Sequence, residues 1–174
     1  LRCRYCDTEY AFHEGDKRTI ASVIEESQRL STWHGHACDL YEITGGEPLL
    51  QKNVHPLMRE LCDRGRTVMV ETSGACDITA CDPRVIRIMD FKTPGSGEAE
   101  RNLWSNVDDL RPADEVKFVI CDRADFDWAC ERIREHGLAE RVDNVLMSPV
   151  NYVAPGREIA GTAADAVEDG VQAA

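Results

Sequence analysis

Short apolar runs alternate along this chain with segments in which apolar residues recur every three or four positions. The short runs are typical of strands that are buried on both faces of a parallel sheet. They predict strands at residues 40–44, 67–72, 85–90, 115–120 and 142–147.

Helical periodicity predicts helices at 20–30 and 54–61, and a third helix that starts at Asp122 and stops at Gly137. Strands that alternate with amphipathic helices form right-handed βαβ units, which build a parallel sheet. The pattern therefore predicts an α/β fold with helices on the outer face of an open parallel sheet.

The last stretch of the chain has a different composition. Alanine, glycine and aspartate dominate residues 156–174, and large apolar side chains are nearly absent there. Such a segment cannot bury enough surface to order itself. We expect one core domain over residues 1–155 and a divergent, disordered tail over 156–174.

Charge and length narrow the function classes. The 174 residues carry a net charge of −12, which argues against direct binding of nucleic acid. No apolar run reaches the roughly 18 residues that a membrane span needs. Six of the eight cysteines are scattered and are expected to be unpaired packing thiols, which favours a reducing cytoplasm.

The other two cysteines, Cys3 and Cys6, form a CxxC pair. This spacing alone is weak, because zinc ribbons, redox dithiols and iron–sulfur sites all use it. A zinc module is a poor alternative, since the sequence has no second CxxC or His pair to complete four ligands.

Three predicted strands end in polar segments, at residues 44–47, 71–74 and 90–94. Any one of them could be an ordinary turn. Because the carboxyl ends of parallel strands meet at one edge of a sheet, we expect the three segments to converge on one mouth.

Cys3-Arg4-Tyr5-Cys6 followed by Thr44-Gly45-Gly46-Glu47-Pro48 resembles the radical S-adenosylmethionine (SAM) enzymes. Their signature is C-x3-C-x2-C followed by a strand that ends in GGEP. The resemblance implies a partial (β/α) barrel. It also implies that Cys3 and Cys6 are the second and third signature cysteines, and the first is expected two residues before Leu1, outside the chain.

At finer grain, residues 1 to about 155 resemble the 7-carboxy-7-deazaguanine synthase family, as a chain truncated at its amino terminus. The motifs that carry this resemblance are CRYCDTEYAF (3–12), TGGEPL (44–49), ETSG (71–74), MDFKTPGSGE (89–98), VKFVICDRAD (116–125) and MSP (147–149).

This resemblance implies a radical SAM carbon–nitrogen lyase of queuosine precursor biosynthesis. Its reaction converts 6-carboxy-5,6,7,8-tetrahydropterin into 7-carboxy-7-deazaguanine, by hydrogen abstraction, a Mg²⁺-assisted ring contraction and loss of ammonia. The implied cofactors are a [4Fe–4S] cluster, SAM and Mg²⁺. The implied partners are the pterin, an external electron donor such as flavodoxin and a second copy of the chain in a homodimer.

The resemblance also assigns roles to residues. Thr8 is implied as a Mg²⁺ ligand and Thr44 as a substrate contact. The implied cluster ligands and SAM-site residues are Cys3, Cys6, Gly45, Gly46, Glu47, Ser73, Asp90, Phe91 and Lys92. For Glu47 two interpretations stay open, a hydrogen-bond acceptor for the SAM ammonium group and a helix-cap carboxylate.

Two other functions remain as alternatives. A glycyl-radical activating enzyme shares the cysteine signature and a GGEP-like strand end, but the Cys-Asp-Thr and Lys-Thr-Pro-Gly-Ser-Gly segments weigh against it. A fragment without activity is the other alternative.

Overall fold

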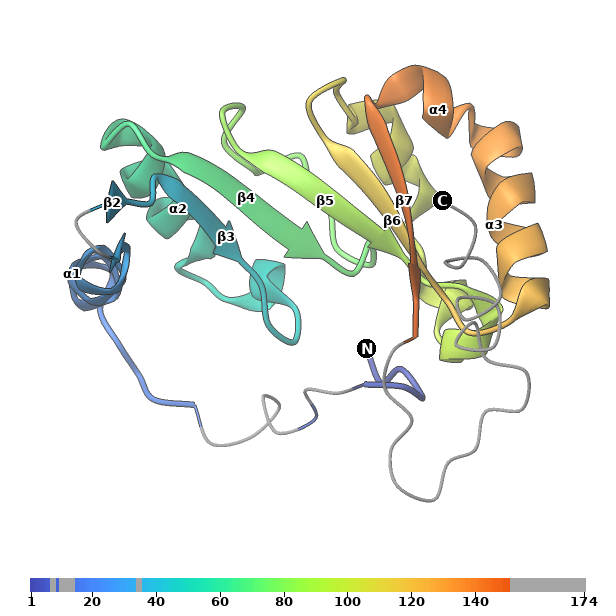
Figure 1. Cartoon of the computed structure of the whole chain (residues 1–174), viewed down its shortest axis with the longest axis horizontal. Coiled ribbons are helices and arrows are strands. Elements are labelled where there is room, and N and C mark those ends of the chain that lie inside the picture. Colours follow the sequence, from blue (N-terminus) through green and yellow to red (C-terminus); the bar gives the residue numbers. More distant parts are fainter. Residues whose placement is uncertain (7–8, 10–14, 34–35, 151–174) are drawn as a thin grey trace.

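A computed structural model describes residues 1–6, 9, 15–33 and 36–150. Its main feature is a five-stranded parallel sheet in the order β3-β4-β5-β6-β7 (Figure 1). The strands are β3 (Leu40–Ile43), β4 (Thr67–Thr72), β5 (Ile86–Phe91), β6 (Glu115–Ile120) and β7 (Asn144–Pro149). The predicted α/β class and parallel sheet are confirmed.

Helices fill the connections between the strands. The α-helices are α1 (Ile20–Leu30), α2 (Val54–Asp63), α3 (Arg123–His136) and α4 (Leu138–Arg141). The 3₁₀ turns that lie wholly within the described residues are η2 (Pro48–Leu50), η3 (Pro94–Ser96), η4 (Ala99–Arg101) and η5 (Trp104–Asp109), and β1 (Thr32–Trp33) pairs antiparallel with β2 (His36–Ala37). None of the described helices is long and apolar enough to cross a membrane.

Local sequence signals set the ends of α3. The Asp122 side chain accepts a hydrogen bond from the backbone N–H of Asp125 and caps the helix. Gly137 ends the helix with φ of 59°, a left-handed conformation in which glycine is favoured. Both signals were predicted. The last strand, by contrast, starts at Asn144 rather than at residue 142, because the unpredicted α4 lies directly before it and Val142 packs into the core.

One face of the sheet carries the core. Strand neighbours such as Met89 and Val116, or Phe91 and Phe118, point to the same side and are fully buried there. Residues of all four α-helices pack against this side, with Ile24 and Met58 in one cluster and Ala129 and Leu138 in the other. The described helices therefore cover one face, as the sequence predicted.

The opposite face of the sheet is free of these helices and carries charged side chains at alternate strand positions. Asp90 of β5 and Lys117 of β6 are register partners on this face, and Glu71 of β4 pairs with Lys117. The sheet does not close on itself, since β3 and β7 are its two edges. An open sheet with one helix-covered face and one polar face is the partial barrel that the sequence predicted.

A buried ion pair fixes the amino-terminal ends of β5 and β6. Arg87 and Asp114 are both nearly inaccessible and form an ion pair, and Arg111 also pairs with Asp114 at 3.1 Å. The backbone N–H of Arg87 donates to Asp114 at 2.9 Å. This network lies at the end of the sheet opposite to the predicted mouth, so its role is to hold the strands in register.

The predicted tail over 156–174 and the last residues of the predicted core domain, 151–155, lie outside the described residues, as does Thr8.

Candidate active site

The chain leaves β3 through Thr44, Gly45 and Gly46, which are exposed at the carboxyl edge of the sheet. Gly45 has φ of +136°, a conformation that residues with a Cβ rarely adopt. A Cβ there would meet no atom within 4 Å, so the backbone angle rather than a lack of space favours glycine. The turn offers backbone, not side chains, to any molecule bound beside it.

Glu47 joins the carboxyl ends of β3 and β4. Its Oε1 accepts hydrogen bonds from the backbone N–H of Leu49 at 3.0 Å and the hydroxyl of Thr72 at 2.9 Å. Its Oε2 accepts from the backbone N–H of Ser73 at 2.9 Å and from the Ser73 hydroxyl. A carboxylate has about four acceptor positions, and the protein uses all four. These contacts show the cap role that the sequence left open, and they bring Ser73 beside the glycine turn.

Asp90 and Lys92, at the end of β5, form a buried ion pair with 2.5 Å between Lys92 Nζ and Asp90 Oδ2. Only 6% of Asp90 is exposed, and burial raises its pKa even though the Lys92 charge acts in the opposite direction. The backbone of Lys92 is held by the Asn102 side chain, which accepts from its N–H at 2.8 Å and donates to its carbonyl at 2.9 Å. Asn102 was not predicted, because it lies ten residues away in a loop without a recognisable motif.

Phe91 lies between Asp90 and Lys92, but its side chain points to the other face of the sheet. Strand residues alternate between the two faces, so Phe91 points away from Asp90. Its fully buried ring stacks on Trp104, with 4.5 Å between ring centroids. The Phe91 side chain therefore belongs to the core on the helix side, and only its backbone lies at the site.

The CxxC segment lies on the loop that follows β5. The backbone N–H of Arg4 donates to the Ser96 carbonyl at 2.9 Å, and the N–H of Cys6 donates to the Cys3 carbonyl at 3.1 Å. Burial raises the pKa of the Cys3 thiol, while the Lys92 charge lowers it. Cys3 and Lys92, both predicted site residues, thus lie within electrostatic reach of each other. Within the described residues, no group of three or more Cys, His, Asp or Glu side chains is arranged to hold a metal ion.

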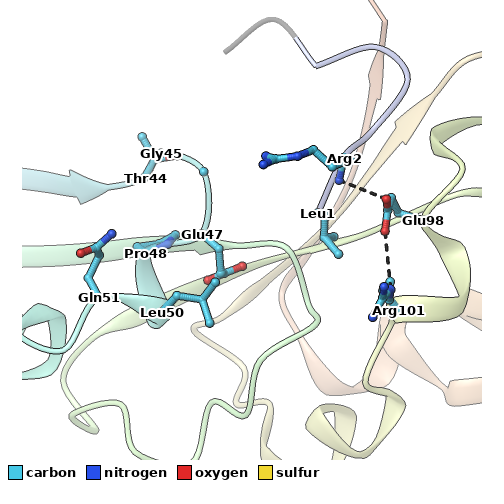
Figure 2. A pocket seen from close by; sticks show the side chains of 11 residues that line it. Leu1, Arg2, Thr44, Gly45, Glu47, Pro48, Leu50, Gln51, Glu98 and Arg101 are labelled. Carbon is cyan, nitrogen blue, oxygen red and sulfur yellow. Dashed lines mark hydrogen bonds and ion pairs between the residues drawn. The ribbon is translucent and has the colours of Figure 1, made fainter. Parts of the chain in front are cut away.

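A cavity of about 700 Å³ lies between the residues directly before the CxxC pair, Leu1 and Arg2, and the glycine turn. One wall is formed by residues 44–48 together with Leu50 and Gln51, and the other by Leu1, Arg2, Glu98 and Arg101 (Figure 2). The Glu98 carboxylate accepts from the backbone N–H of Arg2 at 3.1 Å and lies 3.8 Å from the Arg101 guanidinium. The second wall was not predicted, since only its Glu98 stands within a motif.

Charged residues continue along the helix-free face. Lys117 Nζ lies 2.8 Å from Glu71 Oε1. Burial lowers the pKa of Lys117, but its hydrogen bond with Glu71 and the charges of Glu71, Asp90 and Glu42 outweigh that effect, and the pKa is raised overall. A charged residue in the middle of an apolar strand run is the signal that could have revealed Lys117. The face is suited to a polar molecule rather than to a further hydrophobic layer.

Comparisons with known proteins agree with this arrangement. A model of the radical SAM superfamily matches residues 1–90. The chain is 43% identical over 150 residues to a 7-carboxy-7-deazaguanine synthase from Koribacter versatilis, covering 86% of this chain and 64% of the relative. It is 36% identical over 151 residues to the synthase from Chlorobaculum tepidum, covering 85% and 66%.

Another relative, the synthase from Clostridium acetobutylicum, is 31% identical over 154 residues, covering 86% of this chain and 68% of the relative. A crystal structure of QueE from Escherichia coli shares the fold, with a TM-score of 0.61 and 18% identity, covering 83% of this chain and 68% of that one. The chain spans slightly less than two thirds of the first two relatives.

The superfamily model spans both the cysteine segment and the glycine turn, and the similarity to the synthases covers more than four fifths of the chain. The chain belongs to the radical SAM superfamily and, within it, to the 7-carboxy-7-deazaguanine synthase family.

Proposed function

We propose that this chain forms the radical SAM core of a 7-carboxy-7-deazaguanine synthase that acts in the cytoplasm. Its reaction would convert 6-carboxy-5,6,7,8-tetrahydropterin into 7-carboxy-7-deazaguanine with loss of ammonia, in the formation of queuosine and related 7-deazapurines. One observation carries the proposal: the residues directly before Cys3 and the turn at Gly45 border the same cavity at the carboxyl edge of the sheet.

The donor set suits an iron–sulfur cluster. Cys3 and Cys6 lie one turn apart and half-buried, and thiolates are the usual ligands of such clusters. When bound, the cluster together with SAM supplies an electron and a 5′-deoxyadenosyl radical. The chain's own contribution would be to hold the thiolates at the cavity and to keep water from the reacting atoms.

Two buried polar atoms support a polar ligand at the same place. Asp90 Oδ1 and the Tyr5 hydroxyl have no hydrogen-bond partner among the described residues. Burial raises the pKa of Tyr5, and the charge of Asp90 raises it further, so the two groups lie within electrostatic reach of each other. Buried polar atoms nearly always have partners. SAM, which has both donors and acceptors, would satisfy them, with Lys92 balancing the charge of Asp90.

The remaining roles rest on the positions of residues 44–47 and 73 and, for Thr8 and the partners, on the family resemblance. Gly45 and Gly46 would let the backbone approach the methionine end of SAM, and Ser73 would line the site beside them while Glu47 holds the turn. Thr44, exposed at the cavity, would contact the pterin. Thr8 would offer its hydroxyl to Mg²⁺, which prefers oxygen ligands. An external electron donor such as flavodoxin and a homodimeric assembly complete the proposal.

The proposal can be tested by complementation. The gene that encodes this chain is expressed in a bacterial strain that lacks its own 7-carboxy-7-deazaguanine synthase, and queuosine in tRNA is measured by mass spectrometry. We expect queuosine to return with the natural sequence and with Cys38→Ala, an exposed cysteine outside the site, and to be absent with Cys6→Ala. Queuosine that returns equally with Cys6→Ala would contradict the assignment.

A further inference from the structure

Asp125 is a buried carboxylate that the proposed function does not use. It lies in the first turn of α3 and is 1% exposed. A buried carboxylate is costly unless several donors stabilise it, so its contacts indicate what it is kept for. They lead away from its own helix to the loop that follows β5.

Three donors from two other segments meet at this carboxylate. Oδ1 accepts from the backbone N–H of Gly95 at 2.8 Å. Oδ2 accepts from the backbone N–H of Cys121 at 3.0 Å. The Thr93 hydroxyl lies 2.9 Å from both Asp125 Oδ2 and the Val119 carbonyl and donates its one proton between them. Thr93 and Gly95 belong to the loop after β5, and Cys121 follows β6. Asp125 therefore ties the loop after β5 to the end of β6 and the start of α3.

The loop packs closely against Asp125 and Cys121 at Gly95. A Cβ at Gly95 would lie 2.4 Å from Asp125 Oδ2 and 2.9 Å from Cys121 Sγ, so no side chain fits there. Thr93 and Ser96 are fully buried, and the Ser96 hydroxyl donates to the Thr93 carbonyl at 2.6 Å. The loop thus has one well-defined position, set by the carboxylate behind it.

The opposite side of this loop carries the CxxC segment. The Ser96 carbonyl accepts from the N–H of Arg4, and Glu98 accepts from the N–H of Arg2. The Arg4 side chain lies against Gly97: a Cβ added at Gly97 would be 3.2 Å from Arg4 Nε. A displacement of the loop would therefore move the backbone on both sides of Cys3.

We infer that Asp125 is a positioning residue for the cysteine segment: it clamps the loop of residues 93–98 from behind, and the loop sets where Cys3 lies. The inference rests on the proposed function only for the use of the two thiols as cluster ligands. The clamp itself is a property of the protein without a cluster and can be measured there.

Asp125→Asn is the sharpest test. An amide placed with its oxygen toward Thr93 and Cys121 turns its NH₂ group toward the N–H of Gly95, so two donors face each other and the bond to the loop is lost. Asp127→Asn is the matched control, since Asp127 lies two residues further on the same helix, is exposed and pairs with Arg123 at 2.9 Å.

The measurement is amide hydrogen exchange by NMR on the cluster-free full chain, with alkylation of the Cys3 thiol by iodoacetamide as a second readout. In Asp125→Asn we expect the Arg4 amide to exchange about tenfold faster or more, the factor expected from losing a hydrogen bond to a charged group. Cys3 should be alkylated several-fold faster. Exchange at Phe118, in the middle of β6, should not change, and Asp127→Asn should match the natural protein at all three positions.

Gly95→Ala provides a second variant that leaves the carboxylate in place and displaces the loop directly. It should also speed Arg4 exchange and Cys3 alkylation, and it decides the question if Asp125→Asn does not fold. Equal Arg4 exchange in Asp125→Asn and Asp127→Asn would overturn the inference. So would an increase at Arg4 that is matched at Phe118, because that result describes general destabilisation rather than a clamp.

Discussion

Glu47 binds two groups of Ser73 with one carboxylate oxygen: its Oε2 accepts hydrogen bonds from both the backbone N–H and the hydroxyl of Ser73. The two residues are 26 positions apart in the sequence: Ser73 directly follows β4, and Glu47 ends the turn that follows the neighbouring strand β3. This contact connects the turn after β3 to the turn after β4, so that a shift of one turn displaces the other. Both turns belong to the proposed SAM site, so its geometry depends on this single carboxylate.

Replacing Glu47 by glutamine should loosen that connection. The amide NH₂ group would face donors that now bind a carboxylate oxygen, so at least one of them loses its partner. We expect the free energy of unfolding to fall by about 1–3 kcal/mol. Urea denaturation measures it. Glu60→Gln is the control: this exposed pair with Arg64 is worth about 0.3–0.5 kcal/mol, and an equal loss in both variants would refute the role of Glu47.

Lys92→Met should make stability depend strongly on pH. Removing the ammonium group leaves Asp90 buried without its hydrogen-bonded ion-pair partner, with only the more distant charge of Lys117 remaining, which costs about 3–5 kcal/mol at neutral pH. The folded-state pKa of Asp90 is already raised from 3.8 by burial, and it should rise further. A raised folded pKa means that stability is highest at low pH and is lost as the pH increases through the folded pKa.

Denaturation of the Lys92→Met variant across pH 4 to 8 tests this sign, with the double variant Asp90→Asn and Lys92→Met as the comparison. The double variant has no carboxyl group to titrate and should be much less sensitive to pH. A single variant whose stability does not fall as the pH rises would show that Asp90 is not buried as described.

Asp114 should make stability depend on pH in the opposite direction to Asp90. Burial favours its neutral form, but hydrogen bonds from Arg87 and Arg111 outweigh burial and lower the pKa of Asp114 from 3.8. Its contribution to stability is therefore complete above that value and is lost as the pH falls through the lowered pKa. Asp114→Asn should cost about 3–5 kcal/mol at pH 7 and less in acid. Exposed Asp108, which lies 3.3 Å from Arg141, gives the control variant Asp108→Asn, and an unchanged acid profile in Asp114→Asn would contradict the prediction.

Magnesium removal tests the proposed role of Thr8. Turnover of the pterin should stop when Mg²⁺ is chelated, and Thr8→Ala should raise the Mg²⁺ concentration needed for half-maximal turnover while SAM cleavage continues. Product formation and 5′-deoxyadenosine formation are measured side by side over a series of Mg²⁺ concentrations. Identical Mg²⁺ dependence in the variant and the natural protein would place the metal elsewhere.

Much of the fold could be predicted because its signals are local. The apolar run at residues 67–72 and the signals at Asp122 and Gly137 specify a strand and the ends of a helix within a few positions. The start of β7 was predicted two residues early, because Val142 is apolar for a different reason: it fills the core below α4. A run of apolar residues does not distinguish pairing in a sheet from packing beside it.

The site was predictable only where a motif carries it. The residues before Cys3 and the turn at Gly45 border one cavity at the carboxyl edge of the sheet, and Cys3 lies within electrostatic reach of Lys92. Asn102 could not be found in this way, because it stands outside every motif and acts through a loop whose course depends on tertiary contacts. Asp125 ends the motif at 116–125, but its contact with the loop after β5 depends on the tertiary structure and is not visible in the sequence. The family resemblance implied Phe91 as a SAM-site residue, and strand alternation turns its ring to the other face, so that only its backbone can face the site.

The central claim is that the cysteine segment and the glycine turn enclose one SAM site that serves a pterin substrate. The most direct measurement is an anaerobic assay of the protein, expressed from its whole reading frame and reconstituted with iron and sulfide. It contains SAM, a reductant, Mg²⁺ and 6-carboxy-5,6,7,8-tetrahydropterin, and mass spectrometry detects the products. The account predicts 7-carboxy-7-deazaguanine with the natural protein and none with Cys6→Ala. Formation of 5′-deoxyadenosine without any conversion of the pterin would contradict it.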